Sequence, residues 1–243
     1  MTTHDATAAG TPVPGRLLAG RYRLGPRRGS GLDIAIFEAI DEREHRPVAV
    51  KVVHPDLCAA AGFLDRFEDT MLRSASVVHP NIARLLDWGI ADWDGRTVVF
   101  TAAENLTGGS LRDLIDRGRT LSPSQGLMVG LDVCKALDAA HRAGLVHGDV
   151  RPANLVFGTD GKVRITDLGL AHLVSEPMWA DPTSVPISRA RFASPEQARG
   201  REVGQKSDVY ALALSLLEAM TGMLPFVGDS TVATLANRVD RLL

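Results

Sequence analysis

Four polar residues on two short stretches of the chain have the types and the spacing that metal-assisted phosphate chemistry requires. Asp149, Arg151 and Asn154 follow a helical run and precede the apolar run 155–157, so we place them on one loop. Asp167 comes thirteen residues after Asn154, on a second loop. Two carboxylates and an amide on adjoining loops suit Mg²⁺ held against phosphate, with one acid left to steer a hydroxyl. The spacing therefore favours phosphate transfer.

The two stretches resemble the catalytic loop and the metal-binding loop of protein kinases. His147-Gly148-Asp149-Val150-Arg151-Pro152-Ala153-Asn154 is similar to the family pattern H-R-D-L-x-x-x-N, and Asp167-Leu168-Gly169 is similar to D-F-G. The chain is identified by this resemblance as a eukaryotic-type (Hanks-type) serine/threonine protein kinase domain of the kind found in bacteria. The implied fold is α+β and bilobal, with a small antiparallel β lobe that carries one helix and a larger, mainly α-helical lobe.

Three further motifs distinguish protein kinases from other phosphotransferases. A His-Gly-Asp motif followed by an asparagine also resembles the active loop of small-molecule phosphotransferases, such as those that modify aminoglycosides or choline. The motifs at 79–82, 194–196 and 208–210 (His-Pro-Asn-Ile, Ser-Pro-Glu and Asp-Val-Tyr) are instead similar to protein kinase motifs. By the same resemblance, Asp208 would hold the backbone of the catalytic loop.

The resemblance implies a role for each matching residue. Asp149 would orient or deprotonate the acceptor hydroxyl, Arg151 would contact the γ-phosphate, and Lys51 would bind the α- and β-phosphates. Asn154 and Asp167 would hold Mg²⁺. ATP and Mg²⁺ are the implied cofactors. The implied nucleotide-binding residues are Gly29, Gly31, Ile36, Ala49, Lys51, Ala103, Glu104, Leu106, Asn154 and Leu155.

Four positions depart from the family pattern. Thr70 lies where the family has a helix glutamate that pairs with the strand lysine, and Ile34 replaces the third glycine of the phosphate loop. Gly148 replaces the arginine before the catalytic aspartate, and Arg189 replaces the threonine that braces it. Because three of these changes would weaken catalysis, the alternative function is a nucleotide-binding pseudokinase that acts as a regulatory or scaffolding module.

Hydrophobic periodicity and capping residues predict the elements that position these residues. Apolar residues three and four apart predict a helix over 63–78. Ser122 followed by Pro123 predicts the start of a long helix. Residues 167–196 show little periodicity. Predicted strands cover 48–53, 82–88 and 97–102, with a hairpin over 25–39, a turn at Asp94-Gly95 and an N-cap at Ser110.

The composition excludes several classes of function. The formal net charge of −2 gives no bulk attraction to nucleic acid, and the longest apolar run, 209–217, is too short to cross a bilayer. The two cysteines lack disulfide or metal spacing and fit a reducing compartment, so we expect a cytoplasmic location. Expected partners are ATP and a protein substrate.

We predict three regions along the chain: a disordered tail over 1–20, a small lobe over 21–103 and a truncated large lobe over 104–243. A domain of this family continues with several more helices, so the large lobe is expected to lack its last helices. The predicted helix over 208–220 is apolar nearly all round, and it would then have one uncovered face. Such a face would favour self-association.

Overall fold

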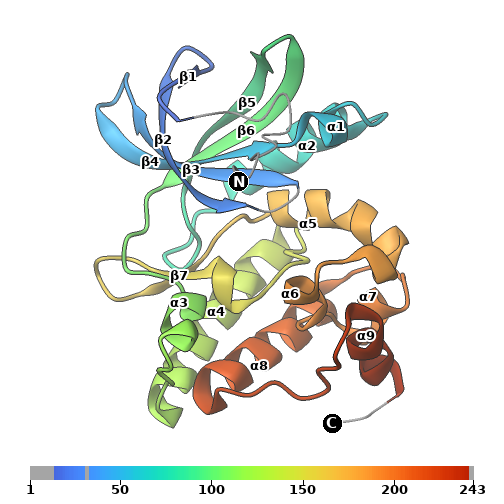
Figure 1. Cartoon of the computed structure of the whole chain (residues 1–243). Coiled ribbons are helices and arrows are strands. Elements are labelled where there is room, and N and C mark those ends of the chain that lie inside the picture. Colours follow the sequence, from blue (N-terminus) through green and yellow to red (C-terminus); the bar gives the residue numbers. More distant parts are fainter. Residues whose placement is uncertain (1–13, 31–32, 241–243) are drawn as a thin grey trace, which may run out of the picture. The chain divides into compact units, whose positions relative to one another are not determined.

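The computed structural model describes residues 14–30 and 33–240, and it has the predicted α+β architecture (Figure 1). The chain divides into two compact units. The first contains the described residues up to Asp69 together with Arg84–Asn105, and the second contains Thr70–Ala83 and the described residues from Leu106 onward. The sequence-based boundary lay between residues 103 and 104.

The first unit is built on an antiparallel sheet with the strand order β1-β2-β3-β4-β6-β5. Burial alternates along the strands because successive side chains point to opposite faces, so Val48, Val50 and Val52 of β4 all enter the core. The strands are β1 (Leu17–Leu18), β2 (Tyr22–Ser30), β3 (Ile34–Asp41), β4 (Arg46–Val53), β5 (Leu85–Trp93) and β6 (Arg96–Glu104).

The predicted end of the N-terminal tail and the predicted start of one strand need correction. Leu17 and Leu18 pair with β2, and Leu18 is fully buried, so the predicted tail over 1–20 extends too far. Residues 1–13 of that tail lie outside the described residues. The strand predicted over 82–88 begins only at Leu85, because Ile82 pairs instead with Ile165 in the second unit.

The turn predicted at Asp94-Gly95 is confirmed. Both residues have positive φ, 53° and 76°, as a two-residue hairpin turn of the mirror-image type requires. Asp-Gly is favoured there because both residue types tolerate this conformation.

Helix α2 (Phe63–Ser76) follows the one-turn helix α1 (Pro55–Cys58). Phe63, Phe67, Met71 and Ser74 are all at most 5% exposed, so the spacing that predicted a helix over 63–78 corresponds to its buried face, although the helix ends at Ser76. The first half of α2 belongs to the first unit and the second half to the second unit.

The second unit is mainly helical, and two of its helices, α4 and α8, pack closely. A Cβ added at Gly130 of α4 would lie 3.0 Å from Leu216 Cδ1 of α8, and Gly126, one turn earlier, faces Met220 in the same way. The helices are α3 (Leu111–Asp116), α4 (Pro123–Arg142), α5 (Leu170–Ser175), α6 (Ile187–Ala190), α7 (Pro195–Ala198), α8 (Gln205–Thr221) and α9 (Thr231–Asp240). A two-stranded ladder, β7 (Leu155–Phe157) with β8 (Val163–Ile165), and the short 3₁₀ turns Pro152–Asn154, Glu176–Ala180 and Pro182–Ser184 complete the unit.

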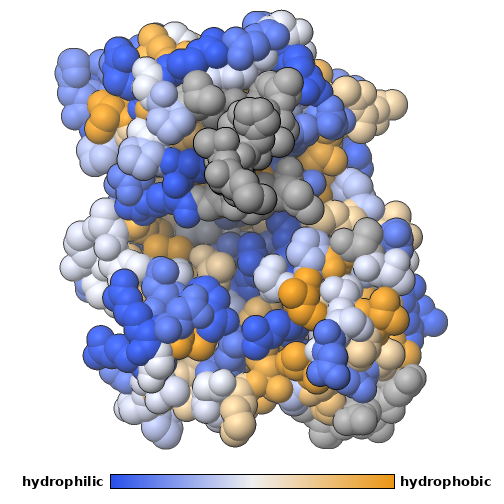
Figure 2. Space-filling model, viewed as in Figure 1, coloured by the Kyte–Doolittle hydropathy of each residue, from blue (hydrophilic) through white to orange (hydrophobic). Residues whose placement is uncertain are grey.

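Apolar side chains of two helices in the second unit are exposed. Leu127, Met128 and Leu131 of α4 are 78%, 68% and 57% exposed, and Val209 of α8 is 55% exposed. On the face shown in Figure 2, hydrophobic residues lie interspersed with hydrophilic ones. None of the helices in the described part of the chain combines the length and the hydrophobicity needed to cross a membrane.

A buried ion pair fixes one end of the sheet. Asp41, at the end of β3, is 1% exposed and accepts hydrogen bonds from Arg21 Nε at 2.8 Å and Arg21 Nη2 at 2.7 Å. The backbone N–H groups of Arg43 and Glu44 also donate to this carboxylate. The Arg21 guanidinium holds the pKa of Asp41 at about 2, well below its ordinary value.

We predict that Asp41→Asn lowers the free energy of unfolding at pH 7 by about 2–3 kcal/mol, because Arg21 loses the more buried of its two carboxylate partners, Asp41 and Asp87. The contribution of Asp41 is fully present above the unfolded-state pKa of about 4, and it is lost as the pH falls through about 2. Glu42→Gln is the matched control, since Glu42 forms an exposed pair with Arg23 and should change stability by less than about 1 kcal/mol. Equal losses in the two variants, measured by urea unfolding, would contradict this account.

Candidate active site

The carboxylate of Asp208 holds the backbone of the predicted catalytic loop. Asp208 lies in the first turn of α8 and is 1% exposed. Its Oδ2 accepts a hydrogen bond from the His147 N–H at 2.9 Å, and its Oδ1 accepts one from the Gly148 N–H at 2.8 Å. Nε2 of His141, near the end of α4, lies 2.8 Å from Oδ2. The predicted role of Asp208 is confirmed.

His147 connects the catalytic loop to the stretch that leads to Asp167. The buried ring accepts a hydrogen bond from the Asp149 N–H at Nδ1, at 3.2 Å, and its Nε2 lies 2.7 Å from the Thr166 carbonyl oxygen. Because Nδ1 accepts a hydrogen bond and a carbonyl oxygen can only accept one, Nε2 is the ring nitrogen that donates, to Thr166. The backbones at Asp149 and Thr166 are thereby tied to one side chain.

The carboxylate of Asp149 is held through one of its two oxygens. Arg151 Nε and Asn154 Nδ2 each lie 3.2 Å from Asp149 Oδ2, and Arg189 Nε lies 3.7 Å from the same oxygen. The Asp149 side chain is 10% exposed. Because these donors converge on Oδ2, Oδ1 is the oxygen that they leave for an acceptor hydroxyl.

Arg189 was noted from the sequence only as a departure from the family pattern. It is carried by α6, and its side chain is 13% exposed. The structure places it beside Asp149, so a cation stands where the family has a hydroxyl. The sequence could have indicated this contact, because Arg189 occupies the position of the family threonine that braces the catalytic aspartate. The structure adds that the arginine brings a positive charge to within 3.7 Å of the Asp149 carboxylate.

The β7–β8 ladder brings the two predicted magnesium ligands together. Leu155 pairs with Ile165, and the Thr166 N–H donates to the Asn154 carbonyl at 3.0 Å. Asp167 follows Thr166 directly and has a φ of 67°, which is rare for a residue other than glycine. The Thr166 hydroxyl donates to Asp167 Oδ2 at 3.2 Å, so the strained residue also has its side chain oriented.

The chemistry of this pair fits Mg²⁺. Asn154 Nδ2 donates to the Asp149 carbonyl at 2.7 Å, so the amide oxygen of Asn154 remains as its ligand atom. Asp167 supplies a carboxylate. Mg²⁺ prefers oxygen ligands and is commonly held by one or two protein groups together with substrate phosphates.

The absence of a side chain at Gly148 leaves space for His172, on helix α5. Gly148 has a φ of 72°, and a Cβ added there would lie 2.7 Å from Nδ1 of His172. Burial lowers the pKa of His172, which favours the uncharged ring where it packs against the loop. With α5 in this position, the family arginine would not fit at residue 148.

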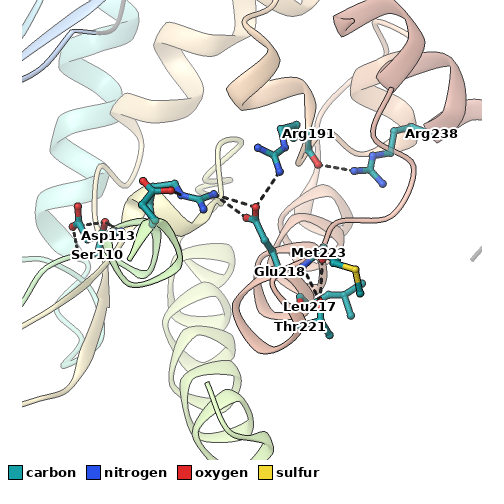
Figure 3. Close-up of polar contacts among 10 residues, drawn as sticks. Ser110, Asp113, Arg191, Leu217, Glu218, Thr221, Met223 and Arg238 are labelled. Atoms are coloured by element: carbon teal, nitrogen blue, oxygen red, sulfur yellow. Dashed lines mark hydrogen bonds and ion pairs between the residues drawn. The ribbon is translucent and has the colours of Figure 1, made fainter. Parts of the chain in front are cut away.

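A buried carboxylate on α8 fastens the segment that carries Arg189. The Glu218 side chain is 3% exposed, and its Oε1 lies 3.1 Å from both Arg112 Nη1 of α3 and Arg191 Nη2. Arg238 of α9 donates from Nη2 to the Arg191 carbonyl at 2.6 Å (Figure 3). Arg191 immediately follows α6, so this segment is tied to both α8 and α9.

The predicted nucleotide-binding residues fall into two groups, one in each compact unit. In the first unit, Ile36 lies opposite Lys51 and Ala49 lies opposite Ala103, so these side chains share one face of the sheet. Gly29 pairs with Ile36 in the neighbouring strand, and Glu104 ends β6 with Oε1 accepting from the Arg84 N–H. Gly31 lies outside the described residues. The second group consists of Leu106, Asn154 and Leu155, in the unit that also contains Asp149, Arg151 and Asp167.

Thr70 contacts the loop that carries Asp167. A Cβ added at Gly169 would lie 2.7 Å from Thr70 Cγ2. One turn further along α2, the Ser74 hydroxyl donates to the Leu168 carbonyl at 3.2 Å. The position at which the family has a glutamate is therefore used here for packing against this loop, a contact that sequence reasoning missed.

We predict that Asp208→Asn lowers the free energy of unfolding by about 3 kcal/mol. The amide oxygen could still accept from one of the two loop N–H groups that now donate to the carboxylate, but the amide NH₂ would face the other, donor against donor. Asp138→Asn is the control, because Asp138 makes an exposed pair with Arg142 on α4. If denaturant unfolding shows the same stability for the two variants, Asp208 does not organise the loop.

The amino-acid sequence is similar to those of known protein families and proteins. The sequence matches the protein kinase domain family over residues 22–243. A probable serine/threonine-protein kinase of Corynebacterium efficiens is 38% identical over 218 residues, and PknB of Mycobacterium leprae is 36% identical over 216 residues. Each alignment covers 89% of this chain but only 33% and 35% of the respective relative, so the chain spans about a third of their length.

A solved structure shows the same fold. The crystal structure of the Mycobacterium tuberculosis PknI kinase domain is 27% identical and has a TM-score of 0.69, and the match covers 90% of this chain and 81% of that chain. The chain therefore belongs to the protein kinase family.

Proposed function

We propose that this chain is the catalytic domain of an ATP-dependent serine/threonine protein kinase. The observation that carries the proposal is the arrangement of Asp149, whose carboxylate is held through Oδ2 while Asn154 beside it offers an amide oxygen. The names of the relatives support serine and threonine hydroxyls as acceptors. A cytoplasmic location fits the free state of Cys58 and Cys134.

In the proposed reaction, Asp149 Oδ1 accepts the proton of a serine or threonine hydroxyl. The hydroxyl oxygen forms a bond to the γ-phosphorus of ATP as the bond to the β,γ-bridging oxygen breaks, which yields a phosphoprotein and ADP. Arg151 contacts the γ-phosphate, and Lys51 binds the α- and β-phosphates. Asn154 and Asp167 would hold Mg²⁺, which neutralises phosphate charge when bound.

Transfer of the γ-phosphate tests the proposal. Asp149→Asn should reduce the transfer rate by at least about a hundredfold, because general base catalysis commonly contributes that much. ATP binding, measured by calorimetry with Mg²⁺ present, should stay close to that of the wild type. Asp160→Asn, which alters an exposed pair with Arg164, is the control and should transfer phosphate normally. Equal transfer by the two variants would rule out the assigned role of Asp149.

A nucleotide-binding pseudokinase is the second candidate, and Thr70 favours it. Threonine carries no charge, so residue 70 cannot supply the ion pair with the strand lysine that the family's helix glutamate supplies. We predict that Thr70→Glu speeds phosphate transfer by at least about tenfold, a barrier change of about 1.4 kcal/mol, with little change in ATP affinity. If wild type and variant both bind ATP and neither transfers phosphate in a single-turnover assay, the pseudokinase function is the correct one.

Self-association remains a prediction for this chain. The predicted uncovered face lies on the helix over 208–220, where Val209 is exposed, and the exposed apolar side chains of Leu127, Met128 and Leu131 on α4 also support self-association.

A further inference from the structure

The chain contains two helix N-termini with the same Ser-Pro-x-Gln sequence. At α4, Gln125 Oε1 accepts from the Ser122 N–H at 2.9 Å, and the Ser122 hydroxyl oxygen accepts from the Gln125 N–H at 3.3 Å. At α7, Gln197 and Ser194 make the same two bonds at 3.0 Å and 3.3 Å. Both are capping boxes, and glutamate serves such a box as well as glutamine does.

Only one of the two glutamines does more than cap its helix. Gln125 is exposed, whereas Gln197 is 4% exposed. Gln197 Nε2 donates to the carbonyl oxygen of Gly148, 49 residues away, at 3.0 Å. The orientation of the amide is set by its partners, because Oε1 faces an N–H group and Nε2 faces a carbonyl. A carboxylate at residue 197 would keep the cap and lose this donor.

The bond from Gln197 reaches the peptide unit that enters Asp149. The N–H of that unit donates to His147 Nδ1 at 3.2 Å, and its carbonyl accepts from Gln197. Gly148, with its φ of 72°, has the widest backbone freedom of any residue type, so it does not fix this peptide by itself. Asp149, Arg189 and Gln197 also line one small cavity together with Trp179.

We propose that Gln197 is a positioning residue for Asp149: through the Gly148 carbonyl it sets the peptide plane from which the catalytic carboxylate projects. The inference rests on the proposed function, since it concerns the geometry of phosphate transfer. It also explains why an amide occupies a buried position at which the cap alone would accept a carboxylate.

The test compares Gln197→Met with Gln125→Met in the full chain. Both variants lose the reciprocal half of a capping box, and only the first also removes a donor from the Gly148 carbonyl. We expect kcat for phosphate transfer to fall by about ten- to a hundredfold in Gln197→Met, because small misplacements of reacting groups cost that much. KM for ATP should stay within about twofold, and Gln125→Met should match the wild type. Values of kcat within about twofold of each other in the two variants, corrected for folded fraction, would overturn the proposal.

Gln197→Glu gives a second variant that keeps the cap, with Gln125→Glu as its control. It should lower kcat like Gln197→Met, because an oxygen replaces the donor that faces the Gly148 carbonyl. A normal kcat in Gln197→Glu would likewise overturn the proposal.

Amide hydrogen exchange separates this proposal from the proposed function. In Gln197→Met the Asp149 amide should exchange at least about tenfold faster than in Gln125→Met, while the Gly148 amide, which donates to Asp208, stays protected. If the wild type transfers no phosphate, the proposed function fails, and the exchange of the Asp149 amide alone decides the role of Gln197. Unchanged exchange at Asp149 would then overturn it.

Discussion

The carboxylate of Asp208 is the interaction on which the rest of the site depends. A carboxylate with 1% exposure is stable only where donors replace the lost water, and here the donors are His141 and the backbone N–H groups of His147 and Gly148. The loop therefore takes its shape as α8 packs against α4. The His147 side chain in turn holds the backbone at Thr166 through a hydrogen bond to its carbonyl oxygen. The positions of Asp149 and Asp167 both follow from the packing of the second unit.

A second set of contacts comes from residues 187–198, which form α6, α7 and the segment that joins them. Glu218 fastens this segment through Arg191, Arg189 reaches the Asp149 carboxylate, and Gln197 reaches the peptide before it. Gly148 lets His172 pack where the family has an arginine, so α5 also lies against the loop. The loop is thus contacted by Asp208, Arg189 and Gln197, while Gly148 occupies the position of the arginine that precedes the catalytic aspartate in the family.

The features that depend on a few neighbouring residues could be predicted from the sequence. The features that depend on contacts between residues far apart in the chain could not. Three local features were predictable because each follows from a few neighbouring residues. They are the spacing of buried residues along α2, the Asp94-Gly95 turn and the helix caps at Ser110 and Ser122. Motif resemblance supplied the role of Asp208. The short strand at Leu17–Leu18 has too few residues for a periodic signal, and α5 forms in a stretch without clear periodicity. The contact of Gln197 joins residues far apart in sequence, so only the folded chain reveals it.

The central claim is that the second unit holds the catalytic loop in place before any nucleotide binds. Hydrogen exchange of the His147 and Gly148 amides, followed by NMR in nucleotide-free protein, tests it most directly. Both amides should exchange as slowly as core amides of α8 such as that of Leu212, because both donate to Asp208. Exchange as fast as that of unstructured backbone amides would show that the loop is not held and would contradict the account.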